Sequence, residues 1–382
     1  MLEIVRNFMK VPLCKPYFDE KENEAVREVL DSGWLAHGPK TKEFEKLFAD
    51  YIGVRHAIAV NSCTSGLQLV LQAFDLRGGE VIIPSFTFVA TANAVVNTRC
   101  KPIFADIKYD TCNIDPDDIE KKITKDTIVI MPVHYAGQSA DMDRIMDLAN
   151  KHNLMVIEDS AETIGGTYNN KKTGSFGMGV FSFYPTKNIT TAEGGMITTN
   201  DSKLADKIEA LKAHGVSSSA FERERKEKPW LRDAIYAGYN YRLPDVLAAI
   251  GITQLKKLEE MNDLRRAHAS YLNENLPKEF MDLPVEDARA KHVYQMYTVK
   301  LHDNIDRTKF LKFLREKEVG ASVHFDPPVH RQSFYKNYYV SLPVTEKVSE
   351  RIVTLPMFPG LKKEELDYMI EVIYDALKVS SL

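Results

Sequence analysis

The stretch that decides the fold is residues 127–157, TIVIMPVHYAGQSADMDRIMDLANKHNLMVI. It begins with the apolar run Thr127–Val133, continues through the helical pattern Met142–His152, and ends in a second apolar run, Leu154–Ile157. Short apolar runs without polar alternation are typical of strands buried on both faces. Asp141 stands directly before the helical pattern, where an N-cap is expected. Two buried strands joined by a helix predict a parallel pair with a right-handed crossover.

The same alternation of strand and helix extends on both sides of this stretch, over residues 20–215. After the second apolar run the alternation of strand and helix is interrupted, because Gly179–Tyr184 and Gly195–Thr199 have strand patterns with only a loop between them. We therefore predict an α/β protein whose mostly parallel, mixed sheet is flanked by helices. Other strands are expected at Ala57–Val60, Glu80–Pro84 and Pro102–Asp106, and other helices at Ser65–Phe74, Thr87–Asn97 and Pro116–Ile123.

A long helical pattern, Pro244–Leu272, is expected to carry the chain from a large first domain into a smaller second one. The charged segment Glu222–Lys228 precedes it and is interpreted as a solvated loop or helix end. The pattern predicts two domains, a large one over residues 1–250 and a smaller C-terminal α+β domain over residues 251–382. In the second domain a strand is expected at Tyr297–Leu301 and helices at Arg307–Lys317 and Lys363–Leu377.

Composition excludes several classes of protein. Hydrophobic residues make up 44% of the 382 residues and charged residues 27%, which is ordinary for a globular protein and excludes disorder. The 50 Lys and Arg residues nearly balance the 54 Asp and Glu residues, giving a net charge of −4, so nucleic acid is not expected as the main partner. The four cysteines have no CxxC spacing and no accompanying His pattern, so we expect free thiols in a reducing compartment and no metal site.

The N-terminus and the apolar runs bear on the location of the protein. Glu3, Arg6 and Lys10 interrupt the N-terminal residues, which therefore lack the continuous apolar core of a signal peptide. The apolar run Ile128–Val133 is far shorter than the roughly 20 residues that span a bilayer. We expect a cytoplasmic protein with no membrane partner.

Residues with chemical capability follow three of the predicted strands, at the ends where ligands of open α/β sheets bind. The small and hydroxyl residues Asn61–Gly66 open a helix, where they form either an anion site or a plain N-cap. Glu158 and Asp159 end a strand, where they could bind a metal, a ribose or a protonated ring nitrogen, or cap a helix. Lys187 follows an apolar strand and is either a partly desolvated nucleophile or an ordinary surface lysine.

Neither a nicotinamide-dependent enzyme nor an NTPase is well supported. A dinucleotide fingerprint reads G-x-G-x-x-G after a strand, whereas Gly174–Gly179 has its spacings reversed and precedes a strand. No G-x-x-x-x-G-K-[ST] loop is present in the sequence.

Motifs spread over nearly the whole chain are more specific together than any one of them alone. They are Ser32–Leu35 with Gly38-Pro39, Asn61–Leu67, Pro84–Thr91, Val133–Gln138, Glu158–Glu162, Phe181–Lys187, Glu193–Gly195, His214-Gly215, Gly238–Arg242, Val323–Phe325 and Leu355-Pro356. With these motifs the chain resembles the DegT/DnrJ/EryC1/StrS family, sugar aminotransferases of the fold-type-I pyridoxal-phosphate class. The resemblance implies the fold-type-I aminotransferase architecture and pyridoxal 5′-phosphate as cofactor.

The resemblance implies a role for three residues around the cofactor ring. Lys187 would link covalently to the cofactor and then move a proton between the cofactor and the substrate carbon. Asp159 would pair with the pyridine nitrogen, keeping it protonated so that the ring can act as an electron sink. Phe88 matches the aromatic position that stacks on the ring, with a core phenylalanine on a helix as the alternative.

The resemblance also implies how the cofactor phosphate is held. It would lie at a helix N-terminus near Cys63, Thr64 and Ser65, and Ser182 would add a hydroxyl group. Asn240 matches an asparagine that reaches the phosphate from the neighbouring subunit. The active sites would then be composite, and the functional unit would be a homodimer.

Two departures from the family pattern concern these residues. The common phosphate turn is Ser-Gly-Thr-Ala, but here Cys63 replaces the glycine and Ser65 the alanine, and Cys63 needs a compatible φ. Glu162 stands where many members have Gln or His beside the cofactor's phenolic oxygen, and a carboxylate there would be repulsive unless one of the two groups is protonated. Glutamate occurs there in some members that act at C4 of the sugar. Lys187 separates the chain from the family's dehydratases, which have histidine.

The resemblance implies transfer of an amino group from L-glutamate to a nucleotide-linked keto sugar, an NDP-4-keto-6-deoxyhexose with a 4-amino product being favoured. Such a step belongs to deoxyamino sugar and cell-surface polysaccharide biosynthesis. Three alternatives stay open, namely a 3-aminotransferase of the same family, a non-catalytic regulator that keeps the fold, and a nicotinamide-dependent sugar reductase. Candidate residues for the sugar-nucleotide side are Trp34, Tyr184 and His324, with Lys212 and Arg331 as further candidates.

Overall fold

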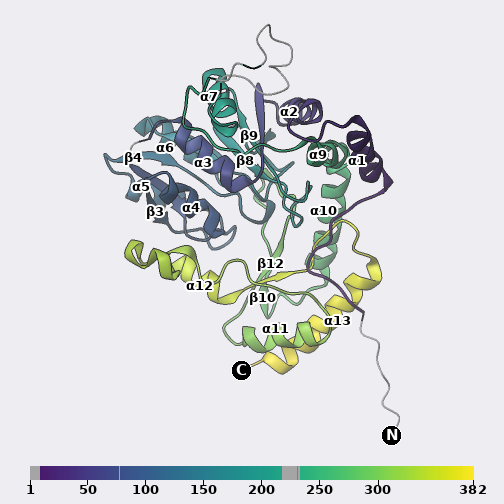
Figure 1. Ribbon diagram of the computed structural model, residues 1–382. Coiled ribbons are helices and arrows are strands. Elements are labelled where there is room, and N and C mark those ends of the chain that lie inside the picture. Colours follow the sequence, from purple (N-terminus) through teal and green to yellow (C-terminus); the bar gives the residue numbers. More distant parts are fainter. Residues whose placement is uncertain (1–8, 77, 217–229, 231–232) are drawn as a thin grey trace.

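The computed structural model describes residues 9–76, 78–216, 230 and 233–382, so the predicted loop Glu222–Lys228 lies outside the described residues. The predicted α/β architecture is confirmed. A seven-stranded sheet crosses the larger part of the molecule (Figure 1) in the order β1-β9-β8-β5-β4-β2-β3, and only β9 runs antiparallel to its neighbours. The strands are β1 (His56–Val60), β2 (Glu80–Pro84), β3 (Lys101–Ala105), β4 (Thr127–Ile130), β5 (Met155–Asp159), β8 (Met178–Ser182) and β9 (Gly195–Thr199).

The side chains of these strands alternate between two apolar layers, as expected of strands buried on both faces. In β1, Ile58 and Val60 pack into one layer, whereas Ala57 and Ala59 pack into the other. The first layer is completed by α3 (Cys63–Ala73), α4 (Val89–Asn97) and α7 (Ser202–Lys212). The opposite face is covered by α2 (Pro39–Ile52) and α9 (Asp245–Lys256) on one half and by α5 (Pro116–Lys122) and α6 (Met142–His152) on the other.

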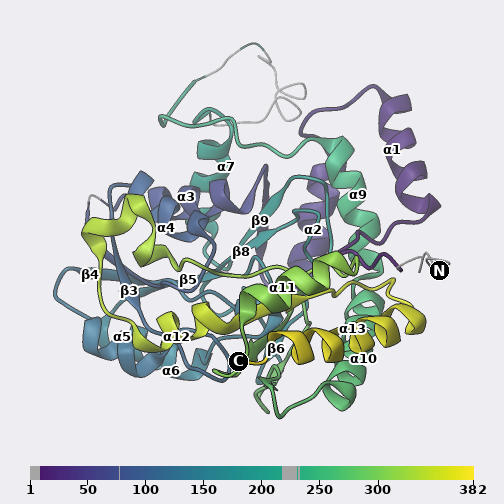
Figure 2. The same cartoon turned by 90° about the horizontal axis from the view of Figure 1, so that it is seen from below.

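A second apolar core lies below the sheet in Figure 1 and joins helices to a small antiparallel sheet, β10-β12-β13. Helices α11 and α13 pack against each other there (Figure 2). Val11 belongs to this core, because its N–H donates to the Glu318 carbonyl at 3.0 Å and its carbonyl accepts from the Gly320 N–H at 2.7 Å. The elements are α10 (Leu258–Asn275), β10 (Met281–Asp282), β12 (Tyr297–Leu301), α11 (Arg307–Glu316), β13 (Ile352–Leu355) and α13 (Lys363–Ser380).

The prediction of one helix over Pro244–Leu272 is wrong. The chain forms two helices, α9 and α10, because Lys257 between them leaves the helical conformation, with φ −111° and ψ 10°. Helix α9 packs on the large sheet, and α10 leads into the second core. The division at residue 250 stays a prediction. The remaining helices and strands are α1 (Glu20–Ser32), η1 (Tyr135–Gly137), β6 (Thr167–Tyr168), β7 (Lys171–Lys172), β11 (Ala290–Lys291), η2 (Val329–Arg331), η3 (Ser333–Tyr338) and α12 (Pro343–Arg351).

Several element ends differ from the predicted ones, and two of them bear on the site. Helix α3 begins at Cys63, two residues earlier than predicted, because Ser62 supplies the N-cap. Helix α4 begins at Val89, two residues later than predicted, because Phe88 has extended backbone, with φ −66° and ψ 141°. Among the described residues, no helix combines the length and the apolar character needed to cross a membrane.

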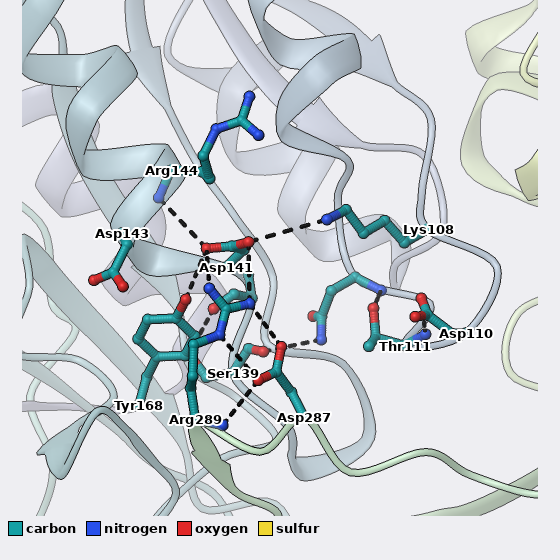
Figure 3. A network of polar contacts seen from close by, with 12 residues as sticks. Lys108, Asp110, Thr111, Ser139, Asp141, Asp143, Arg144, Tyr168, Asp287 and Arg289 are labelled. Carbon is teal, nitrogen blue, oxygen red and sulfur yellow. Dashed lines mark hydrogen bonds and ion pairs between the residues drawn. The ribbon is translucent and has the colours of Figure 1, made fainter.

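A polar network fastens the segment before β11 to the large sheet's helices (Figure 3). Asp141, the N-cap of α6, accepts a hydrogen bond from the Tyr168 hydroxyl at 2.7 Å and pairs with Arg289 at 3.2 Å. Arg289 also pairs with Asp287 at 2.8 Å, and the Asp287 N–H donates to Gln138 Oε1 at 2.7 Å. The segment that leads toward the second core is therefore held against the turn that follows β4.

Glu158 is fully buried, and its carboxylate is enclosed by hydrogen-bond donors. It accepts from the N–H groups of Gly174 at 2.7 Å, Phe176 at 2.8 Å and Gly177 at 3.0 Å, and lies 3.0 Å from His134 Nε2. Since the other nitrogen of this imidazole accepts a backbone N–H, Nε2 carries the proton and donates it to the carboxylate. Glu158 is therefore a structural residue that orders the loop before β8, and not part of an open ligand site.

We expect Glu158→Ala to lower the free energy of unfolding by about 3–5 kcal/mol, because the buried donors around it lose their acceptor. Urea unfolding followed by circular dichroism measures the change. Glu120→Ala, at an exposed residue on α5, is the control and is expected to leave the free energy of unfolding nearly unchanged. A Glu158 variant as stable as this control would contradict the structural role.

Candidate functional site

The parallel strands of the large sheet present their carboxyl ends at one edge, where the predicted residues gather. Asp159 ends β5, and Lys187 follows β8. Helix α3 begins directly after β1, and Phe88 follows β2. The sheet topology thus brings together residues that lie far apart in the sequence.

Asp159 is buried and fixed by two donors. Thr91 Oγ1 donates to Oδ2 at 2.8 Å, and the Ala161 N–H donates to Oδ1 at 3.2 Å. The single hydroxyl proton of Thr91 goes to Asp159, so Thr87, whose Oγ1 lies 2.8 Å from Thr91 Oγ1, donates to Thr91 in turn. Burial raises the pKa of Asp159, and the two donors offset part of the shift. The result is a carboxylate of raised basicity, held in one orientation.

Lys187 forms an ion pair with Glu162 inside the site. Its Nζ lies 3.3 Å from Glu162 Oε1, and the side chains are only 15% and 8% exposed, respectively. The other oxygen, Oε2, accepts the N–H of Ala136 at 2.9 Å. Ala136 has a left-handed backbone, with φ 56°, which is unfavourable for a residue with a Cβ and is found at sites where the surrounding structure imposes it. A strained turn therefore orients the carboxylate that faces the lysine.

The N-terminus of α3 offers, at the same edge, backbone donors that no other described residue is bonded to. Ser62 is the N-cap, and its Oγ accepts the Ser65 N–H at 3.1 Å. The N–H groups of Cys63 and Thr64, in the first turn, have no partner within the helix and can bind an anion together with the helix dipole. The Ser65 hydroxyl lies 2.7 Å from Asn61 Oδ1, to which it donates, so this side chain is used within the turn.

Cys63 is tolerated where a glycine was expected, because it lies in the first helical turn and not in a left-handed conformation. Its Sγ lies 4.0 Å from Asp159 Oδ1 and 3.8 Å from the Val180 carbonyl. Burial raises the pKa of this thiol well above its usual value, and the charge of Asp159 adds to the effect. The side chain is therefore a neutral thiol that links the α3 N-terminus to Asp159. Ser182, at the end of β8, accepts the Tyr184 N–H at 3.4 Å through its hydroxyl oxygen.

Phe88 is not a core residue, so that alternative is wrong. Its side chain is 63% exposed, although Phe88 follows a fully buried stretch of β2. The ring lies 6.4 Å from that of Phe325, which in turn lies 6.0 Å from Phe86 and 6.3 Å from Tyr135. An exposed ring supported by this aromatic group is available to stack on a flat ligand.

His324 faces the same site from the second half of the chain. Its Nδ1 lies 2.8 Å from Thr354 Oγ1, and its carbonyl accepts the Tyr135 hydroxyl at 2.6 Å. Burial lowers the pKa of His324, and the charges of Glu162 and Lys187 act on it in opposite directions. The imidazole is therefore neutral at neutral pH and stands close enough to Lys187 to sense its charge. Tyr184, in contrast, has an exposed ring in the loop before Lys187.

Trp34 and Lys212 lie elsewhere. They line a cavity of about 820 Å³ whose described lining includes neither Lys187 nor Asp159. Lys212 is almost fully buried there, and its Nζ lies 2.9 Å from both Glu45 Oε1 and Glu209 Oε2. Lys212 therefore belongs to an ion-pair cluster, and its assignment to the sugar-nucleotide side is not supported.

Asn240 and Arg331 have partners outside the Lys187 site. Asn240 is exposed and accepts the Arg242 Nε–H at 2.9 Å. Arg331 pairs with Glu346 at 2.7 Å. Within one chain the structure does not bring these two residues to Lys187, and their predicted roles stay predictions.

The ion-pair cluster around Lys212 predicts a pH effect on stability. Burial by itself would raise the pKa of Glu209, but Lys212 and Lys42 lower it below the usual 4.5. A lowered native pKa stabilises the fold above 4.5, and this contribution is lost as the pH falls through the native value. We expect Glu209→Gln to be less stable than the wild type at pH 7, and the difference in urea-unfolding free energy to shrink below pH 4. A difference that stays constant down to pH 2.5 would contradict the assignment.

Two residues of the site were missed by the sequence analysis. Thr91 holds Asp159, and its only signal in the sequence was a second hydroxyl residue, Thr87, four positions earlier, whose Oγ1 contacts that of Thr91. Ala136 orients Glu162 through a backbone N–H, which no side-chain pattern reports.

Comparisons with known proteins agree with this geometry. A sequence model of the DegT/DnrJ/EryC1/StrS aminotransferase family matches residues 16–374. The spore coat polysaccharide biosynthesis protein SpsC of Bacillus subtilis is 38% identical over 379 residues, which cover 96% of this chain and 97% of that protein.

Solved structures of similar proteins have the same fold. PseC of Helicobacter pylori, an aminotransferase involved in the biosynthesis of pseudoaminic acid, superposes with a TM-score of 0.91 at 29% identity, covering 97% of this chain and 100% of that one. Spr1654 of Streptococcus pneumoniae, solved in its PMP form, superposes with a TM-score of 0.91 at 27% identity, covering 98% of this chain and 100% of that one.

Proposed function

Because the chain belongs to the DegT/DnrJ/EryC1/StrS aminotransferase family, and is therefore an enzyme of the α/β aminotransferase fold, we propose that it transfers an amino group from L-glutamate to a nucleotide-linked keto sugar. The acceptor is an NDP-4-keto-6-deoxyhexose, and the product carries the amine at C4. The observation that carries the proposal is the convergence of the Lys187–Glu162 pair, buried Asp159 and the α3 N-terminus at one edge of the sheet.

The residues present fit pyridoxal 5′-phosphate. The donor set combines an amine, a buried carboxylate of raised pKa and free N–H groups at a helix N-terminus. Asp159 would hold the ring nitrogen, the N–H groups of Cys63 and Thr64 with the Ser182 hydroxyl would hold the phosphate, and Phe88 would cover the ring. When bound, the cofactor supplies an electron sink for the carbanion that forms at the amino-bearing carbon.

Side chains of the protein would bind and transfer the protons of the reaction. Lys187 would link to the cofactor and, once freed, would move a proton to and from the substrate carbon. Glu162 holds the lysine Nζ in place, since it lies 3.3 Å from Nζ and is itself held by the Ala136 N–H. Thr91 fixes the Asp159 carboxylate, which would pair with the ring nitrogen.

The fold supports a composite site in a homodimer. Asn240 is exposed, and its backbone pairs with that of Ala213, the residue directly after α7. We assign it to the phosphate of the neighbouring subunit, which accounts for its lack of a contact with its own Lys187. We place the dimer in the cytoplasm, acting on soluble nucleotide sugars.

The position of the new amine rests on Glu162. A carboxylate at this place favours the 4-amino product, and Tyr184 and His324 are the residues we assign to the sugar side. Trp34 lines the separate cavity, so we assign it to the nucleotide sugar bound at the site of the neighbouring subunit and not at the site of its own chain. The second candidate is a 3-aminotransferase, which shares every other feature of the site.

A direct assay tests the proposal. Purified protein with pyridoxal 5′-phosphate and L-glutamate is incubated with a panel of nucleotide-linked 3-keto and 4-keto sugars, 2-oxoglutarate is measured, and NMR locates the amine. We expect turnover with a 4-keto-6-deoxyhexose and a 4-amino product. Turnover with 3-keto sugars alone would establish the second candidate. Failure of glutamate to convert the bound cofactor to its pyridoxamine form would instead favour a non-catalytic regulator.

A further inference from the structure

The segment Val293–Met296, between β11 and β12, is bonded to the chain on both sides of Lys187. The Gln295 side chain donates from Nε2 to the Thr186 carbonyl at 2.9 Å. The Asn188 side chain donates to the first carbonyl of the segment at 3.1 Å. The residues immediately before and after the lysine are therefore tied to one short piece of backbone.

The same segment holds the turn that orients the lysine's partner. The Val293 N–H donates to the Gly137 carbonyl at 2.9 Å, and the Met296 N–H donates to the Ala136 carbonyl at 3.2 Å. Ala136 in turn donates its own N–H to Glu162 Oε2 at 2.9 Å. Both members of the ion pair thus depend on this segment for their position.

Burial and close approach show that these contacts are built into the fold. Gln295 is 5% exposed, and within the described part of the chain its Oε1 has no partner. The bond from Nε2 to the Thr186 carbonyl therefore fixes the orientation of the amide group. Gly137 has φ 109°, and a Cβ there would stand 2.8 Å from the N atoms of both Tyr294 and Gln295. The segment can approach the turn this closely because that residue is glycine.

We infer that Gln295 is a positioning residue for the lysine. It holds the peptide that precedes Lys187, and this bond, together with the Ala136 turn on the same segment, keeps the lysine Nζ against Glu162. A lysine side chain is long and flexible, so its amine stays at one place only if its backbone is fixed. The inference rests on the proposed function in taking Lys187 as the cofactor-linked lysine.

The test replaces Gln295 by methionine, which has similar length but cannot donate to the Thr186 carbonyl. In the full chain before cofactor is added, acetylation of Lys187 is measured by mass spectrometry relative to exposed Lys312. We expect the relative rate to rise roughly fivefold, the change that loss of one net hydrogen bond produces. After pyridoxal 5′-phosphate is added, the lysine-linked absorbance band is expected to form about fivefold more slowly.

Three further variants make the test specific. Gln72→Met is the matched control, because Gln72 also donates from Nε2 to one partner, the Tyr239 hydroxyl, and also has an unpartnered Oε1 among the described residues. Gln295→His should restore both readouts toward wild type, since His Nε2 can donate at a similar reach. Asn188→Ala removes the bond from the residue after the lysine to the Val293 carbonyl. This variant replaces Gln295→Met in the experiment if circular dichroism shows that Gln295→Met does not fold.

The outcomes separate the inference from the proposed function. Equal Lys187 labelling in wild type, Gln72→Met and the folded Gln295→Met or Asn188→Ala protein would overturn the inference. A wild-type protein that forms no lysine-linked band would overturn the proposed function, while the labelling experiment would still decide whether Gln295 positions the lysine. If labelling and band formation in Gln295→His are close to wild type, the hydrogen bond that residue 295 donates positions the lysine, and not the packing of its side chain.

Discussion

Replacing Lys187 by alanine is expected to abolish the lysine-linked absorbance band of pyridoxal 5′-phosphate and the amino transfer. The variant loses both the amine that links to the cofactor and the group that moves the proton, and the proton transfer alone accounts for about 10²–10⁴-fold in rate. The measurements are the absorption spectrum after cofactor addition, mass spectrometry of the borohydride-reduced protein, and 2-oxoglutarate release from glutamate.

Lys172→Ala is the matched control for this prediction. Lys172 also forms an ion pair at 3.3 Å, with Glu259, but lies on β7, which belongs to a different sheet from the strand that ends at Asp159. We expect it to keep the absorbance band and the activity. If Lys187→Ala still attached the cofactor covalently, another lysine would be the linked residue, and the assignment of this site would fail.

The second large effect is expected from Asp159→Asn. Asparagine keeps the shape of the side chain and an oxygen that can accept from Thr91, but it removes the negative charge that holds the ring nitrogen's proton. Loss of one such electrostatic contact in a buried site costs about 10²–10³-fold in kcat. Steady-state kinetics with glutamate and the preferred keto sugar measure the loss.

Asp106→Asn is the control for the charge. Asp106 is also buried, directly after β3 at the same edge of the sheet, and accepts from the Thr345 N–H and hydroxyl at 2.7 Å. It lies next to Thr345 and Val344, and we expect its substitution to affect stability more than kcat. An Asp159→Asn enzyme with near wild-type kcat would show that this carboxylate does not act on the ring nitrogen.

Much of the fold and the centre of the site could be predicted from the sequence. Buried parallel strands have a short apolar pattern, and the residues that follow their carboxyl ends share one edge, which made Asp159 and Lys187 candidates. Only the resemblance to the family gave the two residues their roles. The break at Lys257 was missed because the apolar periodicity continues across it, and only the backbone shows the change of direction.

The rest of the site could not be predicted, because it depends on contacts without a sequence pattern. Gln295 reaches Thr186 across 109 positions, and Ala136 acts through its backbone. Lys212 was a further candidate for the substrate side without a spacing that fixed its partner, and its Nζ is in fact paired with two glutamates. Spacing along the chain contains no information on such pairings.

The pairing of Val11 with the backbone beside Gly320 has a mechanical consequence. The chain leaves the second core at Val11, enters α1, which packs on α9 beside the large sheet, and returns to the second core along α10. Further along, Val329, Tyr335 and Leu342 pack into the core of the large sheet before β13 rejoins the second core, so more than two covalent connections join the two cores within the described residues. A second core tied at this many points is restrained against both twisting and rocking. Cutting the chain between Val11 and α1 should therefore leave the second core held against the large sheet by the remaining connections, with the large sheet still folded.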